Sequence, residues 1–577
     1  MELSCAADTS QPRAARALQA LPLEASPSDH LLFGTRGSAA TRRLSYAVWA
    51  FVLLGVIVRL GRYLLNFPLW CDEAYVAANF IDRGYAELLA PLEFGQVCPP
   101  FFLWIELTAV KLLGFSEWSL RLFPVLCGVG AVFVFRHVAA RLLSGSALLA
   151  AVAVFAVSYS PVRHAVEVKS YSADLLVSLA LLALTLKWRT EPRQTRWLWA
   201  LTAAMPIAVG LSYPAVFVAG GVSLAIFVDL WKRGQRRQWL AFLAYNASLL
   251  ISFSVLFLAV GRAQYDHSVE RAATTDFWAN RFPPLTEPLR LMLWMLEQHT
   301  GRMFGYPVGG DHGGSALVFV CCAVAIAVLW RCRQSTVLVL LLTPFALNLV
   351  AAALNRYPYG GSARVTQHLA PMICILAGLG AVAMLARLKG AATRRIAMNG
   401  LAASLAVFGG GMIAHDIVHP YKQPYDEQMR DFARFLWREK ASDSHLACMS
   451  RDLHVRFASA ALRGSGAAQA QYLCNQAIFS PRTRGGEDPS DLSGVTARQP
   501  LRCVMFSRAD HAHEADANSW LAEMQQRFDW IGYEKHDFRS YYLRREGGKE
   551  RFEVFEFVPK GDAAAAGIAW RVGSIGR

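Results

Sequence analysis

Charged residues are scarce in this chain of 577 residues: they make up 18% of it, against 54% hydrophobic residues. A soluble protein of this length typically has about 25% charged residues. The mean hydropathy is +0.28. The apolar residues also stand in long runs, such as residues 319–330 and 338–354, and not in the stripe of period about 3.6 that marks a soluble helix. These features argue against a soluble helical bundle and favour a polytopic α-helical membrane protein.

Three further absences narrow the class of protein. No helix has a continuous basic face with interleaved aromatic residues, so the formal net charge of +15 does not indicate nucleic-acid binding. The 11 cysteines include no CxxC pair and no zinc-type spacing with histidine. The N-terminal segment has no apolar run before Leu44. We therefore expect residues 1–44 to be a disordered cytoplasmic tail rather than a cleaved signal peptide.

Apolar runs of about 16–22 residues predict about eleven membrane-spanning helices. They lie near residues 46–66, 119–140, 146–160, 172–187, 197–212, 214–231, 239–260, 314–330, 335–354, 365–386 and 396–415. Residues 45–416 are thus expected to form a transmembrane domain, with one long outer loop at 67–118.

The basic residues support this count of spans because they gather in alternate loops. They are Arg42 and Arg43; Arg136 and Arg141; Lys187, Arg189, Arg193 and Arg196; Lys232, Arg233, Arg236 and Arg237; Arg331 and Arg333; and Arg387, Lys389, Arg394 and Arg395. By the positive-inside rule, these loops and the N-terminus are cytoplasmic, and the C-terminal region lies outside the membrane.

One apolar segment is not counted as a span. Residues 99–114 are short and contain Glu106 and Lys111. Counting them would reverse every later loop and place the basic clusters outside. We therefore expect a helix that lies on the outer surface or dips into it.

The composition becomes that of a soluble protein after the last span, and we expect residues 417–577 to form an extracytoplasmic α/β domain. An amphipathic helix is expected at 426–440, strands at 445–449, 501–506 and 552–557, and a helix at 520–528. No motif with catalytic spacing stands out in this region.

Three outer segments concentrate ionisable residues, which are costly at a membrane boundary. In the first, Asp72 and Glu73 follow the first span. Adjacent carboxylates can bind a divalent cation or act as a general base. A solvated helix N-terminus, where acids are favourable, is the alternative interpretation.

The second outer segment covers residues 159–171 and contains His164, Glu167, Lys169 and Tyr171. Cations close to the bilayer surface suit a phosphate, and tyrosine suits the headgroup boundary. An interfacial anchor is the alternative interpretation of this segment.

The third outer segment covers residues 355–364, with Tyr357, a Gly-Gly pair and Arg364, and Gln367 follows it. The Gly-Gly pair permits close backbone approach, and Arg364 suits an anion. Carboxylates, cations and this arginine share one face of the membrane in the predicted topology. Together they indicate a site where a carboxylate base activates an acceptor while cations hold a phosphate leaving group.

The sequence resembles the C-type glycosyltransferases, in particular the group of protein O-mannosyltransferases, lipid A aminoarabinose transferases and core galacturonosyltransferases. The resemblance covers residues 45–390 and is strongest over 68–180. It is based on the Asp-Glu-Ala run at 72–74, Pro-Pro-Phe-Phe at 99–102, Gly-Phe-Ser-Glu-Trp-Ser-Leu-Arg at 114–121 and Glu-Val-Lys-Ser-Tyr at 167–171.

The resemblance implies a C-type glycosyltransferase fold, a polyprenyl-phosphate-sugar donor, an extracytoplasmic active site in a bacterial inner membrane, and inversion at the anomeric carbon. The acceptor would be a lipid, a glycan or a protein. Asp72 would be the catalytic base, with Glu73 supporting it or helping to hold a metal. The resemblance further implies that Arg121, Lys169 and Arg364 contact the lipid phosphate, and that Tyr171 and Gln367 line the site.

One departure bears on the cofactor. The residue before the Pro-Pro pair is often histidine in relatives but is Cys98 here. Metal dependence is therefore open: a divalent cation would suit the carboxylates, and so would pairing with arginine and lysine. Two other functions stay as alternatives, a transporter or flippase for a lipid-linked sugar and a non-catalytic scaffold whose outer domain binds a partner.

Overall fold

The computed structural model describes residues 39–264, 281–308, 314–439, 446–448, 466–479, 500–508, 521–522, 524–539, 549–561 and 571–573. Most of the predicted N-terminal tail, residues 1–38, lies outside the described residues.

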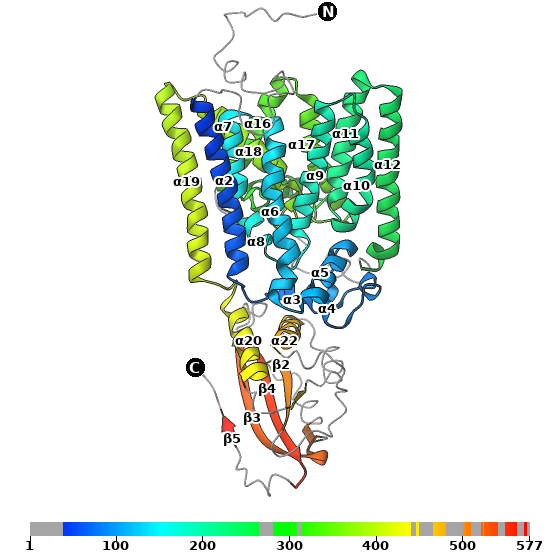
Figure 1. The fold of residues 1–577 in the computed structure, drawn as a ribbon, viewed down its shortest axis with the longest axis vertical. Helices are drawn as coiled ribbons and strands as arrows, with labels where there is room; N and C mark the ends of the chain where they lie inside the picture. Colours follow the sequence, from blue (N-terminus) through cyan, green and yellow to red (C-terminus); the bar gives the residue numbers. More distant parts are fainter. Residues whose placement is uncertain are drawn as a thin grey trace, which may run out of the picture.

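A bundle of apolar helices forms the larger part of the molecule (Figure 1). In the described part of the chain, 9 helices are long and apolar enough to cross a membrane, and two shorter apolar helices stand among them. The long ones are α2 (Ala39–Leu64), α6 (Glu117–Leu142), α9 (Tyr171–Thr190), α11 (Ala215–Arg233), α12 (Arg236–Leu256), α16 (Gly314–Arg331), α17 (Ser335–Ala353), α18 (Ala370–Leu385) and α19 (Ala391–Val418); the shorter ones are α7 (Gly145–Val157) and α10 (Arg196–Leu211). Each predicted span falls on one of these helices, so the polytopic helical class is confirmed.

The acidic loop and the C-terminal region lie at the same end of the bundle. The loop contains α3 (Cys71–Ala77), α4 (Asn79–Asp82) and α5 (Pro100–Leu113), which Figure 1 shows next to the C-terminal elements, whereas α2 begins at the opposite end. At 14 residues, α5 is shorter than the candidate spans and packs against α6 and α10. Its Glu106 is fully buried, and burial raises the pKa of that carboxyl well above its ordinary value.

Shorter helical segments connect the long helices. They are η2 (Glu87–Leu89), η3 (Glu93–Gly95), α8 (Tyr159–His164), η4 (Phe257–Gly261), α15 (Pro288–Thr300), η5 (Arg302–Phe304), η6 (Gln367–Leu369) and η7 (Phe435–Glu439). Among them, α8 forms the first part of the predicted second outer segment, and η6 follows the third.

Where the structure describes the C-terminal region, it contains a five-stranded mixed sheet of order β1-β2-β4-β3-β5 and the helices α20 (Pro424–Arg434) and α22 (Gly466–Phe479). The strands are β1 (Leu446–Cys448), β2 (Leu501–Arg508), β3 (Phe528–Arg539), β4 (Lys549–Pro559) and β5 (Arg571–Gly573). Strand β4 pairs antiparallel with both β2 and β3. The edge strand β1 pairs parallel with β2, and the edge strand β5 pairs parallel with β3. The predicted α/β class is confirmed, and the three predicted strands coincide with β1, β2 and β4.

The sequence did not predict α22 or β3. The helix expected at 520–528 is described only at 521–522 and 524–527, and Phe528 already begins β3. The sequence of β3, FDWIGYEKHDFR, does not alternate cleanly between apolar and polar residues. Its extended form follows from pairing with β4, a contact that the local pattern does not reveal.

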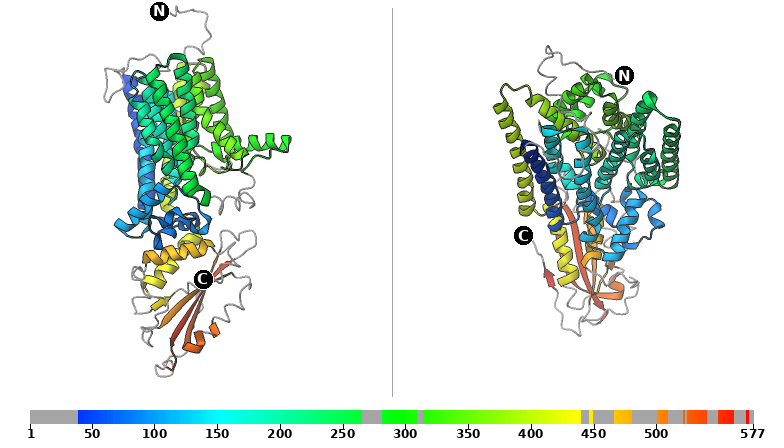
Figure 2. Two further views of the ribbon diagram at one scale, coloured as in Figure 1. Left: turned by 90° about the vertical axis from the view of Figure 1, so that its right-hand side faces the viewer. Right: turned by 45° about the horizontal axis from the view of Figure 1, so that its top comes forward.

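Helix α22 lies between the bundle and the sheet, as Figure 2 shows, and packs against α3. Ala470, Cys474 and Ala477 of α22 share a buried apolar cluster with Ala74 and Ala77 of α3. The C-terminal region therefore rests directly on the loop that contains the acidic residues.

Candidate functional site

Helix α3 begins immediately after Trp70 and directs its two adjacent carboxylates differently. Glu73 accepts a hydrogen bond from the backbone N–H of Trp70 at 3.3 Å, which is favourable for an acid in the first turn. Its side chain is 0% exposed, whereas that of Asp72 is 17% exposed. Only Asp72 of the pair is therefore open to a substrate.

The inward carboxylate, Glu73, forms a bidentate ion pair with Arg121 of α6. Its two oxygens accept from Nε at 2.8 Å and from Nη2 at 2.7 Å. Arg121 also donates to the backbone carbonyls of Phe67 and Pro68, and Glu73 accepts from the N–H of Val168 at 3.1 Å. The pair thus joins the acidic loop, α6 and the segment before α9 at a point without solvent.

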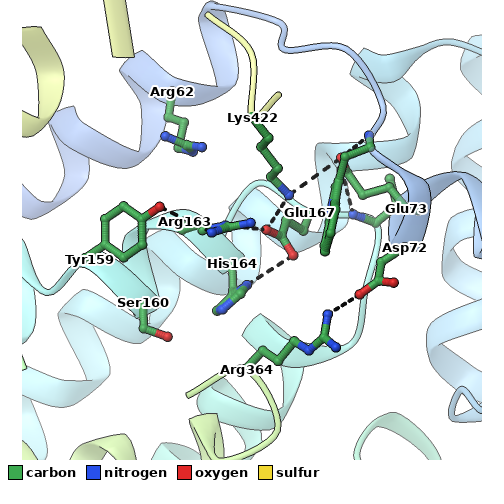
Figure 3. Close-up of polar contacts among 12 residues, drawn as sticks. Arg62, Asp72, Glu73, Tyr159, Ser160, Arg163, His164, Glu167, Arg364 and Lys422 are labelled. Carbon is green, nitrogen blue, oxygen red and sulfur yellow. Dashed lines mark hydrogen bonds and ion pairs between the residues drawn. The ribbon is translucent and has the colours of Figure 1, made fainter. Parts of the chain in front are cut away.

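A second buried carboxylate, Glu167, is contacted by two cationic side chains and a histidine (Figure 3). Lys422 Nζ lies 2.5 Å from one oxygen, Arg163 Nε 3.2 Å from the same oxygen, and His164 Nδ1 3.0 Å from the other. Although burial alone would raise the pKa of Glu167, the positive charge of Lys422 and the contacts with His164 and Arg163 hold it well below its ordinary value. Glu167 is therefore ionised across the physiological pH range.

Lys422, which sequence reasoning missed, reaches this cluster from the segment between α19 and α20. Its ammonium group is 3.9 Å from Glu73 Oε2 and 4.3 Å from the centre of the Trp70 ring. Burial lowers the pKa of Lys422 to about 8, against the opposing charges of Glu167 and Glu73. The sequence signal that could have indicated Lys422 is its position: it is a lysine that follows the last span closely, on the side of the membrane where the loops have few basic residues.

The partly exposed carboxylate, Asp72, forms an ion pair with Arg364, which comes from the segment between α17 and η6. The Arg364 side chain is 14% exposed. Figure 3 shows this pair beside the Glu167 cluster but separate from it. Both groups retain solvent access. The carboxylate can therefore take a proton from one substrate, and the guanidinium can hold an anionic group of another.

The remaining predicted residues surround these groups. Lys169 Nζ bonds Gln96 Oε1, and the Tyr171 ring lies edge-on to His164 with centroids 5.1 Å apart. The hydroxyl of Tyr357 donates to the carbonyl of Val365 at 2.8 Å, and Gln367 Nε2 donates to Ser160 Oγ at 2.6 Å. Tyr357 and Gln367 therefore fix the two ends of the segment that contains Arg364.

Within the described part of the chain, no three or more His, Cys, Asp and Glu residues are grouped so as to hold a metal ion. The carboxylates of the site face cations of the protein: Glu73 faces Arg121, Glu167 faces Lys422, and Asp72 faces Arg364.

Part of this chain is similar to known mannosyltransferases. Residues 97–259 match the family model described as dolichyl-phosphate-mannose-protein mannosyltransferase. A protein of Bacillus subtilis (strain 168), YycA, whose name assigns it provisionally to the mannosyltransferases, is 30% identical over 185 residues. That match spans 30% of this chain and only 26% of the relative. The predicted resemblance to polyprenyl-phosphate-dependent glycosyltransferases is confirmed over this segment.

Solved structures of similar shape include two membrane transferases. ArnT from Cupriavidus metallidurans bound to undecaprenyl phosphate has a TM-score of 0.46 at 14% identity, covering 89% of this chain and 98% of that one. The oligosaccharyltransferase of Archaeoglobus fulgidus, in the apo form, has a TM-score of 0.45 at 11% identity, covering 80% of this chain and 69% of that one.

Proposed function

We propose that this chain, which resembles the dolichyl-phosphate-mannose-protein mannosyltransferases over residues 97–259, is a membrane glycosyltransferase. It moves one sugar from a polyprenyl-phosphate carrier to a hydroxyl of a lipid, glycan or protein. The observation that supports this function best is the partly exposed pair of Asp72 and Arg364 at the end of the helical bundle. The family description names a lipid-phosphate-linked donor, and this pair offers a base and a cation for such a reaction.

In the proposed reaction, the carboxylate of Asp72 takes the proton from the acceptor hydroxyl as its oxygen attacks the anomeric carbon. The bond between that carbon and the phosphate oxygen breaks, and the polyprenyl phosphate leaves with both electrons of the bond. A single displacement of this kind inverts the anomeric configuration. Arg364 holds the phosphate and stabilises the charge that develops on it.

This role for Arg364 requires an exchange of partners. In the structure its guanidinium pairs with Asp72. A donor phosphate that binds Arg364 draws the guanidinium from the carboxylate, which leaves Asp72 free to accept a hydrogen bond from the acceptor hydroxyl. Arg121 is 2% exposed and fully engaged by Glu73 and backbone carbonyls. We therefore assign the phosphate contact to Arg364 and a supporting role to Arg121 and Glu73.

The proposed orientation follows from the loop charges. The basic loops mark the cytoplasmic face, and the acidic loop and the C-terminal region then lie outside a bacterial inner membrane. The polyprenyl chain of the donor would lie in the bilayer beside the bundle, with its phosphate at the level of Arg364.

The test is transfer from a panel of radiolabelled polyprenyl-phosphate sugars by purified protein in lipid nanodiscs, with a membrane extract as acceptor. Asp72→Asn should abolish transfer and leave expression and insertion unchanged. Asp82→Asn, in the same outer loop on the exposed surface of α4, is the matched control and should transfer normally.

Each outcome decides between functions. Labelled product from the wild type and Asp82→Asn alone supports a glycosyltransferase with Asp72 as base and identifies its sugar. Equal product from Asp72→Asn removes that residue from the mechanism. Movement of a labelled lipid across the bilayer without transfer would indicate a flippase instead.

A further inference from the structure

The ammonium group of Lys422 lies between the two buried carboxylates of the site. It is 2.5 Å from Glu167 and 3.9 Å from Glu73, and its side chain is only 6% exposed. These carboxylates belong to segments far apart in the sequence, α3 and the turn before α9. Figure 3 shows the lysine entering from above them, on the chain that leaves the last span.

We propose that Lys422 is a positioning residue through which the segment after the last helix holds the loops of Glu73 and Glu167 in the arrangement that places Asp72. The inference rests on the proposed function. Lys422 is not assigned a contact with substrate; it acts on Asp72 through Glu73 and the first turn of α3.

The electrostatics of the buried cluster show why a cation is needed at this point. A carboxylate removed from water requires opposing charge and hydrogen bonds, and breaking a buried pair by removing one partner is strongly destabilising. Glu73 has Arg121, and Glu167 has Arg163 and His164. Lys422 lies within ion-pair distance of both carboxylates. It therefore offsets the repulsion between them and joins their two loops.

Two further contacts hold the C-terminal region to the segment that precedes Asp72 and Glu73. Arg430 Nη1 of α20 donates to the carbonyl of Asn66 at 2.7 Å, and Gln471 Nε2 of α22 donates to the carbonyl of Leu69 at 3.0 Å. Trp70, which follows Leu69 in the chain, has its ring centre 4.3 Å from the Lys422 ammonium group. Docking of the C-terminal region and placement of the acidic loop are thus one structural unit.

A pH profile separates this role from simple packing. The charged and titratable groups facing Lys422 are Glu73 on α3, Arg163, His164 and Glu167 on α8 and the turn after it, and Asp426 on α20. Because burial lowers the pKa of Lys422 to about 8, the lysine loses its charge in mildly alkaline solution. Arginine at this position stays charged there.

The first experiment measures transfer from pH 6 to pH 10 for the wild type, Lys422→Arg and Lys422→Met. The wild type should lose activity with an apparent midpoint near the pKa of Lys422, about 8. Lys422→Arg should keep activity above that pH, and Lys422→Met should lower kcat by about tenfold or more while KM for the donor changes by less than about threefold. Lys560→Met, whose lysine is exposed in the C-terminal region, should match the wild type.

Two results would overturn the proposal in this assay: normal kcat in Lys422→Met, or the same alkaline midpoint in the wild type and Lys422→Arg. If the wild type transfers no sugar at all, the proposed function fails, and a second measurement still tests Lys422.

That measurement is a double-mutant cycle on thermal unfolding with Lys422→Met and Glu167→Gln. The unfolding temperature should fall in Lys422→Met, and by less than half as much when Glu167→Gln is already present. Equal shifts in both backgrounds, or no shift in the wild-type background, would show that the lysine does not hold the Glu167 loop.

Discussion

Arg364 and Asp72 form an ion pair although 292 positions separate them in the sequence. Their side chains keep 14% and 17% exposure, whereas Glu73 and Glu167 are completely buried. The site therefore has two kinds of carboxylate. Asp72 is accessible and held by a single described cation, and the two buried carboxylates form the framework behind it.

Arg364→Ala should lower kcat/KM for the donor by about 10²–10³, the effect typical of removing one group that stabilises developing charge. The loss should come with weaker inhibition by undecaprenyl phosphate, because the variant lacks the proposed phosphate contact. Steady-state transfer assays with and without undecaprenyl phosphate measure both effects.

The exposed arginine of the same segment provides the control for this prediction. Arg356→Ala removes an equal charge from the surface and should leave both quantities near wild type. Unchanged inhibition by undecaprenyl phosphate in Arg364→Ala would contradict the assignment of the phosphate to Arg364.

Glu73→Gln should destabilise the protein by about 3–5 kcal/mol, because it leaves the buried guanidinium of Arg121 without its charge partner. Thermal unfolding of the purified variants measures this effect. The double variant Glu73→Gln with Arg121→Gln should be more stable than Glu73→Gln alone, since no unpaired charge remains. A double variant less stable than either single variant would show that the loss of stability does not come from leaving one charge of the pair unpaired.

The membrane-spanning helices were predictable from the sequence because each is a local apolar run. The count of spans depended on α5, where Glu106 and Lys111 argued against a crossing; in the structure this helix has 14 residues and its Glu106 is buried. The pairing of Asp72 with Arg364 was not predictable at this level. The sequence placed both residues on one side of the membrane, but nothing in it specified their contact.

Arg121 and Lys422 show the limit of such prediction. The sequence motif around Arg121 indicated a functional position, but its burial against Glu73 depends on how α6 packs under the acidic loop. Lys422 belongs to no motif, and its role follows from where α19 ends and α20 begins relative to Glu167. Contacts between distant segments depend on tertiary packing, which the local sequence pattern does not reveal; α22 and β3 were missed for the same reason.

Asp426→Asn should stabilise the protein at pH 8 and have little effect at pH 4. Burial raises the pKa of Asp426 to about 7 from an ordinary value of 3.8, although Gln471 donates to it at 2.7 Å. Between these two pKa values, about 4 and 7, the carboxyl is ionised in the unfolded chain but still protonated in the folded protein. The free energy of unfolding of the wild type therefore falls as the pH rises through this range. Thermal unfolding of both proteins across this range measures the difference. A difference in unfolding temperature that does not change with pH would contradict the raised pKa of Asp426.

Gly361→Ala should reduce transfer by displacing the segment that contains Arg364. Gly361 has φ of +61°, where an alanine costs roughly 1–2 kcal/mol, and its Cβ would lie 2.8 Å from Cζ of Arg281 and closer to neighbouring atoms of that side chain. Since the backbone carbonyl of Arg281 also accepts a hydrogen bond from the backbone N–H of Tyr359, the strain acts directly on this turn.

Gly410→Ala is the matched control, because nothing lies within 4 Å of its Cβ in helix α19. We expect Gly361→Ala to raise KM for the donor and Gly410→Ala to transfer at the wild-type rate, as initial-rate assays would measure. Equal rates in both variants would mean that the Gly-Gly turn does not set the position of Arg364.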